Sequence, residues 1–404
     1  MKKFNYQAKD AASGKIIKAM VQAESEVSAA KLLMTQGLTP LKISEIDEAG
    51  NNPIAKLLGR ITSKDKIVFT RQLSTLLSAG IPLAQSLHTV AEQTENKNLE
   101  RVIEEIIAAI EGGKSLGDAF GAHPDVFDPI FLALIAAGEV SGTLDDSLKR
   151  IADQQEKDAA VMSKIRGALT YPLIVFVVII GVVIFMLVTV VPQVQNIYTS
   201  MGKTLPTLTQ IMVTMASFVT HFWWVVLLVV GAGGYFSFQY LKTESGIKFK
   251  DTFKLNVPLF KGMFRKLYMA RFARTGQTLL QTGVSMLDTL KITGEAVNNT
   301  IIEKSIDRAA EKVKGGKALS TALQSEDYIL TMVPQMIKIG EQSGKIDDML
   351  GKIAKIYEDE LDEEIRAIST AIEPIMMVIL AAVAGGIVGA VLFPIYSLAG
   401  GINI

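Results

Sequence analysis

Three long stretches without a charged residue constrain the fold of this chain more than any other feature. Residues 172–191, 208–240 and 374–398 contain no Asp, Glu, Lys or Arg. At a rise of about 1.5 Å per residue, a helix over the first stretch matches the roughly 30 Å of a bilayer's hydrocarbon core. Buried core helices are a poor alternative for the first and third stretches, which are apolar on every side. The sequence therefore predicts transmembrane helices at residues 170–192, 208–240 and 373–398.

Basic residues mark one end of each predicted span. Lys164 and Arg166 precede the first span, and a cluster of lysine and arginine follows the second. The loop at 193–207 carries only Lys203, and nothing basic follows the third span. Since cytoplasmic flanks are enriched in lysine and arginine, we expect the N-terminus and residues 241–370 to be cytoplasmic. The short loop and the C-terminus are then external.

A polar segment that occurs twice reveals an internal duplication. Gly138–Asp146 reads GEVSGTLDD, and Gly340–Asp348 reads GEQSGKIDD, at an offset of 202. Further upstream, FTRQLSTLLSAGIPLAQSL from Phe69 matches FARTGQTLLQTGVSMLDTL from Phe272 at an offset of 203. The register holds from these segments through a predicted span, which indicates a duplicated unit rather than chance similarity.

Each copy is predicted to be a cytoplasmic helical domain followed by a span that runs from inside to outside. Apolar residues recur at three- and four-residue spacing within the copies, as expected for helices. The domains occupy residues 54–168 and 241–370. Two parallel copies cannot be joined directly, so the span at 208–240, which has no counterpart, returns the chain to the cytoplasm. The expected fold is a mainly α integral membrane protein with two helical-bundle domains and three transmembrane helices.

The first fifty residues differ in kind from the rest. Residues 4–9 and 15–23 flank Ala-Ala-Ser-Gly and predict a β-hairpin. A helix is expected at 25–36 and a third strand at 39–46. Residues 1–50 are thus predicted to form a small ββαβ module, which suits docking better than catalysis.

The repeated Gly-Glu-x-Ser-Gly segment is predicted to be a tight corner between two helices. Gly138 can end one helix, and Ser141 or Thr143 can cap the next. Asp145 and Asp146 then complement the N-terminal dipole of that second helix. A purely structural corner is one interpretation of this pattern.

An acidic docking point or cation site is the other interpretation, because capping does not require the two glutamates of the corners. The candidate partner-contact or hinge residues are Glu139, Ser141, Gly142, Asp145, Asp146, Glu341, Ser343, Gly344, Asp347 and Asp348.

Prolines and small residues add two further expectations. A long helix leads from each corner towards the bilayer, and Pro172 and Pro374 stand where these helices enter the membrane. We expect a kink at each proline, through which cytoplasmic movement could reach the spans. In the third span, Ala381, Gly385 and Gly389 form a small-residue ridge that allows close helix packing, either within one chain or between chains.

Enzymatic and nucleic-acid functions find no support. Acidic and basic residues balance at 41 each, so no global charge attracts nucleic acid. Cysteine is absent, and no two of the three histidines have a metal-ligand spacing. GGKS at 112–115 lacks the first glycine of a phosphate-binding loop, since position 108 is Ala108, and the second copy reads GGKA. We predict no catalytic residue, cofactor or metal.

The duplicated unit, the three spans and the two corners together resemble the PilC/GspF family, the inner-membrane platform proteins of type IV pilus and type II secretion machines. The resemblance also rests on Phe69 with Arg71, on Phe272 with Arg274, and on TYPLIVF before the first span. It covers nearly the whole chain. The second copy departs from the first at Lys345, where Thr143 stands, and at Glu373, where Tyr171 stands, so we expect the domains to make different contacts.

The resemblance implies a non-enzymatic, multi-pass protein of the cell inner membrane. It implies as partners a cytoplasmic hexameric assembly ATPase, pilins or pseudopilins, inner-membrane alignment proteins, the lipid bilayer and further copies of the chain. Glu139 and Glu341 are the first candidates for contact with the ATPase. Pilus assembly and type II secretion are both open, and a membrane-anchored scaffold or transporter-like protein unconnected with pili is the alternative.

Overall fold

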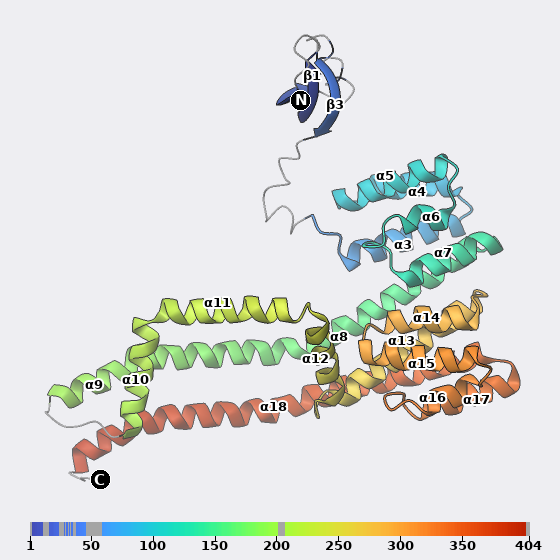
Figure 1. Ribbon diagram of the computed structural model, residues 1–404. Coiled ribbons are helices and arrows are strands. Elements are labelled where there is room, and N and C mark those ends of the chain that lie inside the picture. The colour runs from blue at the N-terminus through green and yellow to red at the C-terminus, as the bar shows by residue number, and fades with distance from the viewer. Residues whose placement is uncertain are drawn as a thin grey trace. The chain divides into compact units, whose positions relative to one another are not determined.

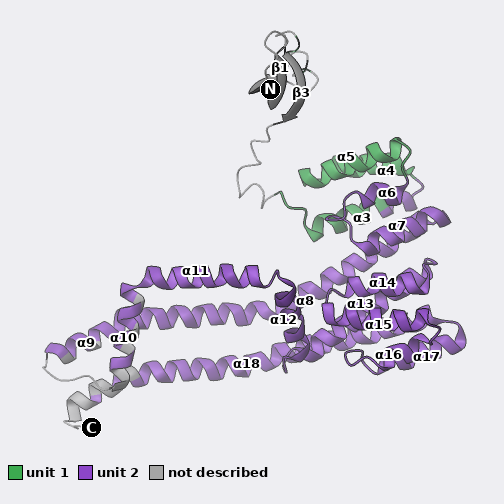
Figure 2. Ribbon diagram, in the orientation of Figure 1, with its two compact units in different colours: residues 1–73, 81–114 green, residues 74–80, 115–404 purple. Residues whose placement is uncertain are grey.

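The computed structural model describes residues 2–10, 16–23, 28, 30, 32, 34, 38–45, 59–200 and 207–400. The chain forms two compact units (Figure 2), one of residues 1–73 and 81–114 and the other of residues 74–80 and 115–404. The second copy of the repeat and all the candidate membrane helices belong to the second unit, whereas the first copy is divided between the two.

Three strands near the N-terminus form one antiparallel sheet (Figure 1). β1 (Lys2–Asp10) lies between β2 (Ile16–Ala23) and β3 (Leu38–Glu45), and pairs with both. The helical residues described between β2 and β3 are Ser28, Ala30, Leu32 and Met34. The remainder of the helix predicted at 25–36 lies outside the described residues.

The first copy of the repeat runs from α3 to the start of α8. Its helices are α3 (Ser63–Ser78), α4 (Leu83–Gln93), α5 (Lys97–Glu111), α6 (Leu116–Gly121), α7 (Pro129–Ser141) and α8 (Leu144–Phe185). Within the first unit α4 packs against α5, because the buried face of α5 carries apolar residues three and four apart. The side chain of Asn96 caps α5 by accepting hydrogen bonds from two N–H groups of its first turn.

The second copy repeats this order of helices. Its members are α13 (Lys261–Gln281), α14 (Met286–Val297), α15 (Thr300–Lys314), α16 (Leu319–Gln324), α17 (Met332–Ser343) and α18 (Ile346–Gly400). One continuous core fills this domain, with Phe272, Leu290, Ile306 and Ile353 fully or almost fully buried. A further helix, α12 (Glu244–Asn256), precedes α13.

The duplication extends to single backbone conformations. Three pairs of glycines at equivalent positions share a positive φ within a few degrees: Gly80 and Gly283, Gly113 and Gly316, Gly142 and Gly344. Glycine adopts this left-handed conformation without the steric cost that a β-carbon brings. The turns of both copies are therefore built on the same residue type at the same place.

Within the part of the chain that the structure describes, three helices are long and apolar enough to cross a membrane, as predicted. They are Leu144–Ile197, Trp223–Tyr240 and Ile346–Gly389. Figure 1 shows α8, α11 and α18 reaching to the same side of the view, away from α13 to α17. The helix window of the second candidate contains no buried residue, which fits a surface that faces lipid.

The end of the first span differs from the prediction. A π turn, Met186–Val190, joins α8 to α9 (Val191–Ser200), so the loop expected at 193–207 begins as a helix. The N–H of Val191 bonds the carbonyl of Met186, which is the wider turn of a π-helix. Pro192 does not interrupt the helix because it falls in the first turn of α9, where a proline is tolerated.

The second span differs from the prediction as well, because it is shorter. Residues 208–240 form two helices, α10 (Thr207–His221) and α11 (Trp223–Tyr240), because Phe222 leaves the helical conformation at φ −112° and ψ 28°. Only α11 is a candidate membrane span. α10 instead packs at Ala216 against the end of the first long helix, in a small buried apolar cluster. A single helix over the whole stretch would be about 50 Å long, well beyond the thickness of a hydrocarbon core.

α8, α13 and α18 pack together just before the two long helices reach their prolines. The buried cluster of α13 and α18 includes Met263, Leu267, Leu361 and Ile368, and Val161 and Ile165 of α8 lie against it. The first and second copies therefore meet along their long helices.

Candidate functional site

The two corners have the same backbone structure. α7 ends at Ser141 and is followed by Gly142, whose φ of +70° reverses the chain, and Gly344 does the same after α17. In each copy the residue after this glycine donates its N–H to the carbonyl of Gly138 or Gly340, at 2.9 and 2.8 Å. This is a Schellman end. The prediction that Gly138 ends the helix was wrong, because the left-handed position falls four residues later.

Gly138 and Gly340 instead allow two helices to touch. Both are buried, and a β-carbon on Gly138 would lie 2.5 Å from the hydroxyl of Ser147 in the first turn of α8. A β-carbon on Gly340 would lie 2.8 Å from the α-carbon of Ile346. Contacts this short do not occur with an ordinary side chain. The glycines therefore set how closely each long helix approaches the helix before it.

Neither hydroxyl residue of the first corner caps the following helix, contrary to the prediction. The hydroxyl of Ser141 donates back to the carbonyl of Ala137 at 2.7 Å, and Ser343 donates to Ile339 at 2.8 Å. Thr143 precedes α8 but makes no side-chain capping bond. Its φ of −113° and ψ of 43° lie outside the extended region that a capping residue adopts.

The glutamates have partners that lie far away in the sequence. The carboxylate of Glu139 accepts hydrogen bonds from the N–H groups of Leu116 at 2.7 Å and Gly117 at 3.0 Å. Glu341 accepts from Ser320, through the N–H at 3.1 Å and through the hydroxyl. Each corner glutamate thus caps the short helix α6 or α16 of its own domain. The sequence indicates no role for these glutamates in capping the helix that follows each corner. The structure gives them a capping role at an earlier helix, α6 or α16.

The acidic residues after each corner remain at the surface. Asp145 and Asp146 are exposed in the first turn of α8, and Asp348 is exposed and Asp347 half-buried in the first turn of α18. Their charges favour the positive N-terminal ends of those helices. Among the described residues, no group of three or more His, Asp or Glu side chains is arranged to hold a metal ion.

A polar interface between the two copies was not predicted. The side-chain pairs that join α8 to the second copy are Arg150–Gln281 at 2.6 Å, Gln154–Thr275 at 3.4 Å and the ion pair Lys164–Asp362. Asp158 lies on the same helix, and burial raises its pKa although the nearby Arg271 guanidinium opposes the change. Because these partners are more than 100 residues apart, no local pattern announces them.

The prolines and the small-residue ridge lie on continuous helices. α8 runs through Pro172, and α18 runs through Pro374. Ala381 and Gly385 are exposed, and no described atom lies within 4 Å of the position that a β-carbon would take on Gly385 or Gly389. The described part of the chain therefore leaves this ridge uncovered.

Fold and corners together define a membrane protein built from two copies of one helical domain, and comparison with known proteins gives its family. Residues 69–192 and 272–394 each match the type II secretion system (T2SS) protein F family, and residues 1–44 match the N-terminal domain of that protein. The chain belongs to this PilC/GspF family. The two matches to one family domain also confirm the duplication read from the sequence.

Relatives of both machine types match over nearly their whole length. The chain is 34% identical to a type IV pilus assembly protein PilC of Thermus thermophilus, over 99% of both chains. It is 36% identical to PilC of Myxococcus xanthus, over 97% of this chain and 94% of the relative. It is 33% identical to a type II secretion system protein F of Aeromonas hydrophila, over 95% of this chain and all of the relative.

Proposed function

We propose that this protein is the inner-membrane platform of a type IV pilus or type II secretion machine, coupling a cytoplasmic assembly ATPase to the insertion of pilins or pseudopilins into a growing fibre. The observation that supports this most is the continuity of α8 and α18. Each begins at the corner of a helical domain and runs through a proline into a candidate span. A displacement of either domain would move a membrane helix, with no catalytic group required.

The contacts between the long helices would make the two domains move together. Lys164 of α8 forms an ion pair with Asp362 of α18, next to the apolar cluster that the helices share. Coupling through this pair predicts that Lys164→Glu and Asp362→Lys each reduce fibre assembly or secretion. The double exchange would restore it, because the opposite charges meet again. A double variant as defective as the single variants would contradict this coupling.

The proposed orientation places the N-terminal docking module (1–50), the domains at 54–168 and 241–370 and both corners in the cytoplasm, and the C-terminus outside. Its support is the distribution of lysine and arginine. Since the chain has no cysteine, single substitutions give an unambiguous test. A membrane-impermeant maleimide should label Ser200→Cys in intact cells and should label Val140→Cys only after lysis. The reverse pattern would invert the orientation.

The corners are the proposed contact with the ATPase, with the exposed aspartates rather than the glutamates as the contacting groups. Glu139 and Glu341 already bond within their domains, whereas the neighbouring Val140 is 91% exposed. A photo-crosslinking amino acid at Val140 or Gln342 should therefore capture the ATPase in cells. Crosslinks from neither position, with normal assembly, would remove the corners as the contact.

Loss of function decides the main proposal. Deletion should abolish surface fibres or the secretion of exported proteins, and the affected process would distinguish the two machines. Normal fibres together with normal secretion after deletion would favour a scaffold or transporter-like protein.

The uncovered ridge of α18 is the proposed self-association surface, with Gly385→Leu expected to weaken crosslinking between copies.

A further inference from the structure

α12 lies at the end of a candidate membrane span and runs across it. α11 ends at Tyr240 and α12 begins at Glu244, and Figure 1 shows α12 crossing the direction of α11. The two helices meet closely, because a β-carbon on Gly246 would collide with the carbonyl oxygen of Tyr240. A helix fixed across the end of a span lies in the plane of the membrane surface.

The two faces of α12 suit that position. One face is buried in the second domain, where Asp251 accepts hydrogen bonds from the N–H and hydroxyl of Thr300, each at 3.0 Å. On the other face Phe249 and Phe253 are each 60% exposed, with their rings stacked at 6.3 Å. Aromatic rings on a helix that also carries lysines are typical of helices that lie in the membrane interface.

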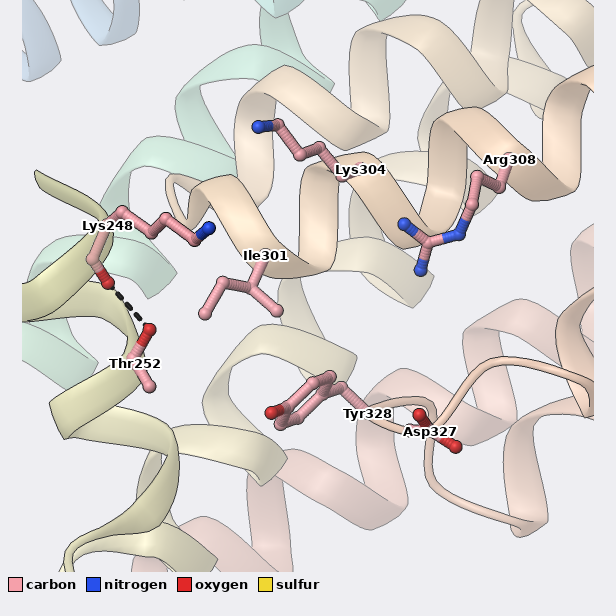
Figure 3. Close-up of a pocket in the computed structure, with 7 residues that line it drawn as sticks. All are labelled: Lys248, Thr252, Ile301, Lys304, Arg308, Asp327 and Tyr328. Carbon is pink, nitrogen blue, oxygen red and sulfur yellow. Dashed lines mark hydrogen bonds between the residues drawn. The ribbon is translucent and has the colours of Figure 1, made fainter. Parts of the chain in front are cut away.

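A basic pocket opens between α12 and α15. Its volume is about 330 Å³, and its lining residues are Lys248, Thr252, Ile301, Lys304, Arg308, Asp327 and Tyr328. Figure 3 shows the Lys248 ammonium and the Arg308 guanidinium reaching towards the pocket from opposite sides. The lining thus contains three basic groups and one carboxylate.

The charges of the pocket are only partly compensated. Arg308 binds the buried carboxylate of Glu326, with 3.0 Å from Nε to Oε2. Lys248 and Lys304 form no ion pair with any residue that the structure describes. The hydroxyl of Thr252 donates to the carbonyl of Lys248, so it offers an incoming group only its lone pairs. The pocket therefore provides two free cations for an anion.

The pocket draws on α12, which precedes the repeated helices of the second copy. At the offset of 203, Lys304 corresponds to Arg101 and Arg308 to Glu105 in the first copy. The residues equivalent to α12 are 41–53, whose beginning lies in strand β3. A feature needed only to fold the repeated domain would be expected in both copies.

We propose that α12 lies in the membrane surface and that the pocket between α12 and α15 binds the phosphodiester headgroup of an anionic phospholipid. Lipid is the phosphate source because the pocket adjoins the end of α11 and the exposed pair Phe249 and Phe253. The carboxylate of Asp327 in the lining suits a singly charged phosphodiester better than a polyphosphate. This site is independent of the pilus or secretion role.

Retention of lipid by the full-length protein tests the site. Native mass spectrometry of the protein in detergent should show retention of phosphatidylglycerol over phosphatidylcholine of the same chain length. Lys248→Gln with Lys304→Gln should lower the retained phosphatidylglycerol by at least about tenfold, since each lysine near a membrane surface contributes attraction to anionic lipid. The matched control is Lys97→Gln with Arg101→Gln in the first copy, which should retain the wild-type preference.

Three outcomes would overturn the lipid site: equal retention of the two lipids, an equal loss in the control variant, or full displacement of phosphatidylglycerol by equimolar inorganic phosphate. The last would make the pocket a site for a soluble phosphate.

The position of α12 at the membrane surface is tested by a nitroxide on Phe253→Cys in vesicles that contain phosphatidylglycerol. This label should be more accessible to oxygen than to a water-soluble nickel chelate, and a label on Val140→Cys should show the opposite. Equal nickel access at the two positions would place α12 off the membrane.

Discussion

Glu341 accepts two hydrogen bonds from Ser320, one from its N–H at 3.1 Å and one from its hydroxyl group. Ser320 lies in the first turn of α16, and Ala318, the residue before that helix, has no side chain that can cap it. In the first copy Glu139 bonds α6 in the same way, but Ser115 caps that helix as well. The corner glutamate is thus joined by a second side-chain cap in the first copy, where Ser115 accepts from the N–H of Asp118, but not at Ala318 in the second.

Removal of either corner glutamate should destabilise its own domain. Glu341→Ala leaves the N–H of Ser320 without its acceptor, at a cost of about 1–3 kcal/mol in the free energy of unfolding. Glu139→Ala leaves the N–H groups of Leu116 and Gly117 without their acceptor and should cost a similar amount, because Ser115 bonds only the N–H of Asp118. Thermal unfolding of the purified full-length protein measures both, with Asp348→Ala, an exposed residue of the same corner, as the control. A loss as large for Asp348→Ala would refute the capping role.

The corner glycines should be intolerant of substitution for two different physical reasons. Gly142→Ala and Gly344→Ala place a β-carbon at φ +70°, which costs about 1 kcal/mol. Gly138→Ala should cost more, since the new methyl group collides with Ser147 and forces α7 away from α8. Gly167→Ala, in open space on α8, is the control and should be neutral or stabilising. Denaturant unfolding that ranks Gly167→Ala with Gly138→Ala would contradict the steric account.

The stability of the second domain should depend on pH through Glu326. Burial alone would raise the pKa of this carboxyl, but hydrogen bonds from Arg308 and Lys312 hold it below the usual 4.5. A lowered pKa stabilises the fold above the unfolded value, and this contribution is lost as the pH falls through the folded value. Glu326→Gln should therefore lower stability at pH 7 by about 1.5–3 kcal/mol. The difference from wild type should shrink below pH 4.5, and a constant difference down to pH 3 would argue against it.

The prolines should matter for assembly more than for folding. Pro172→Ala and Pro374→Ala restore a backbone N–H in each long helix, which would stiffen the helix where it enters the membrane. We expect the double variant to reach wild-type levels in the membrane but to assemble fewer fibres or secrete less protein. Ala168→Pro, one turn before Pro172, serves as a control because it adds a break instead of removing one. Full activity of the double alanine variant would mean that a proline kink has no required mechanical role.

The sequence by itself determined the three membrane helices, the duplication and the position of both corners. These features are local or periodic: a run without charge has few alternatives to a membrane helix, and a repeated GEVSGTLDD fixes a register without any knowledge of the fold. The same local reasoning failed where the chain had a choice. The sequence predicted that α7 ends at Gly138, whereas the helix continues to Ser141 and Gly142 follows it. It also predicted one helix where α10 and α11 are separated at Phe222.

Only the tertiary structure decided which distant groups meet. Glu139 finds its partners 23 and 22 residues earlier, and Lys164 finds Asp362 across 198 residues. Such pairs depend on the angles at which whole helices pack, and those angles follow from the close approach at Gly138 and Gly340 and from the apolar cluster of α8, α13 and α18. A carboxylate has the same local sequence signature whether it faces solvent or a helix end. Packing alone made the corner glutamates caps and left the aspartates at the surface.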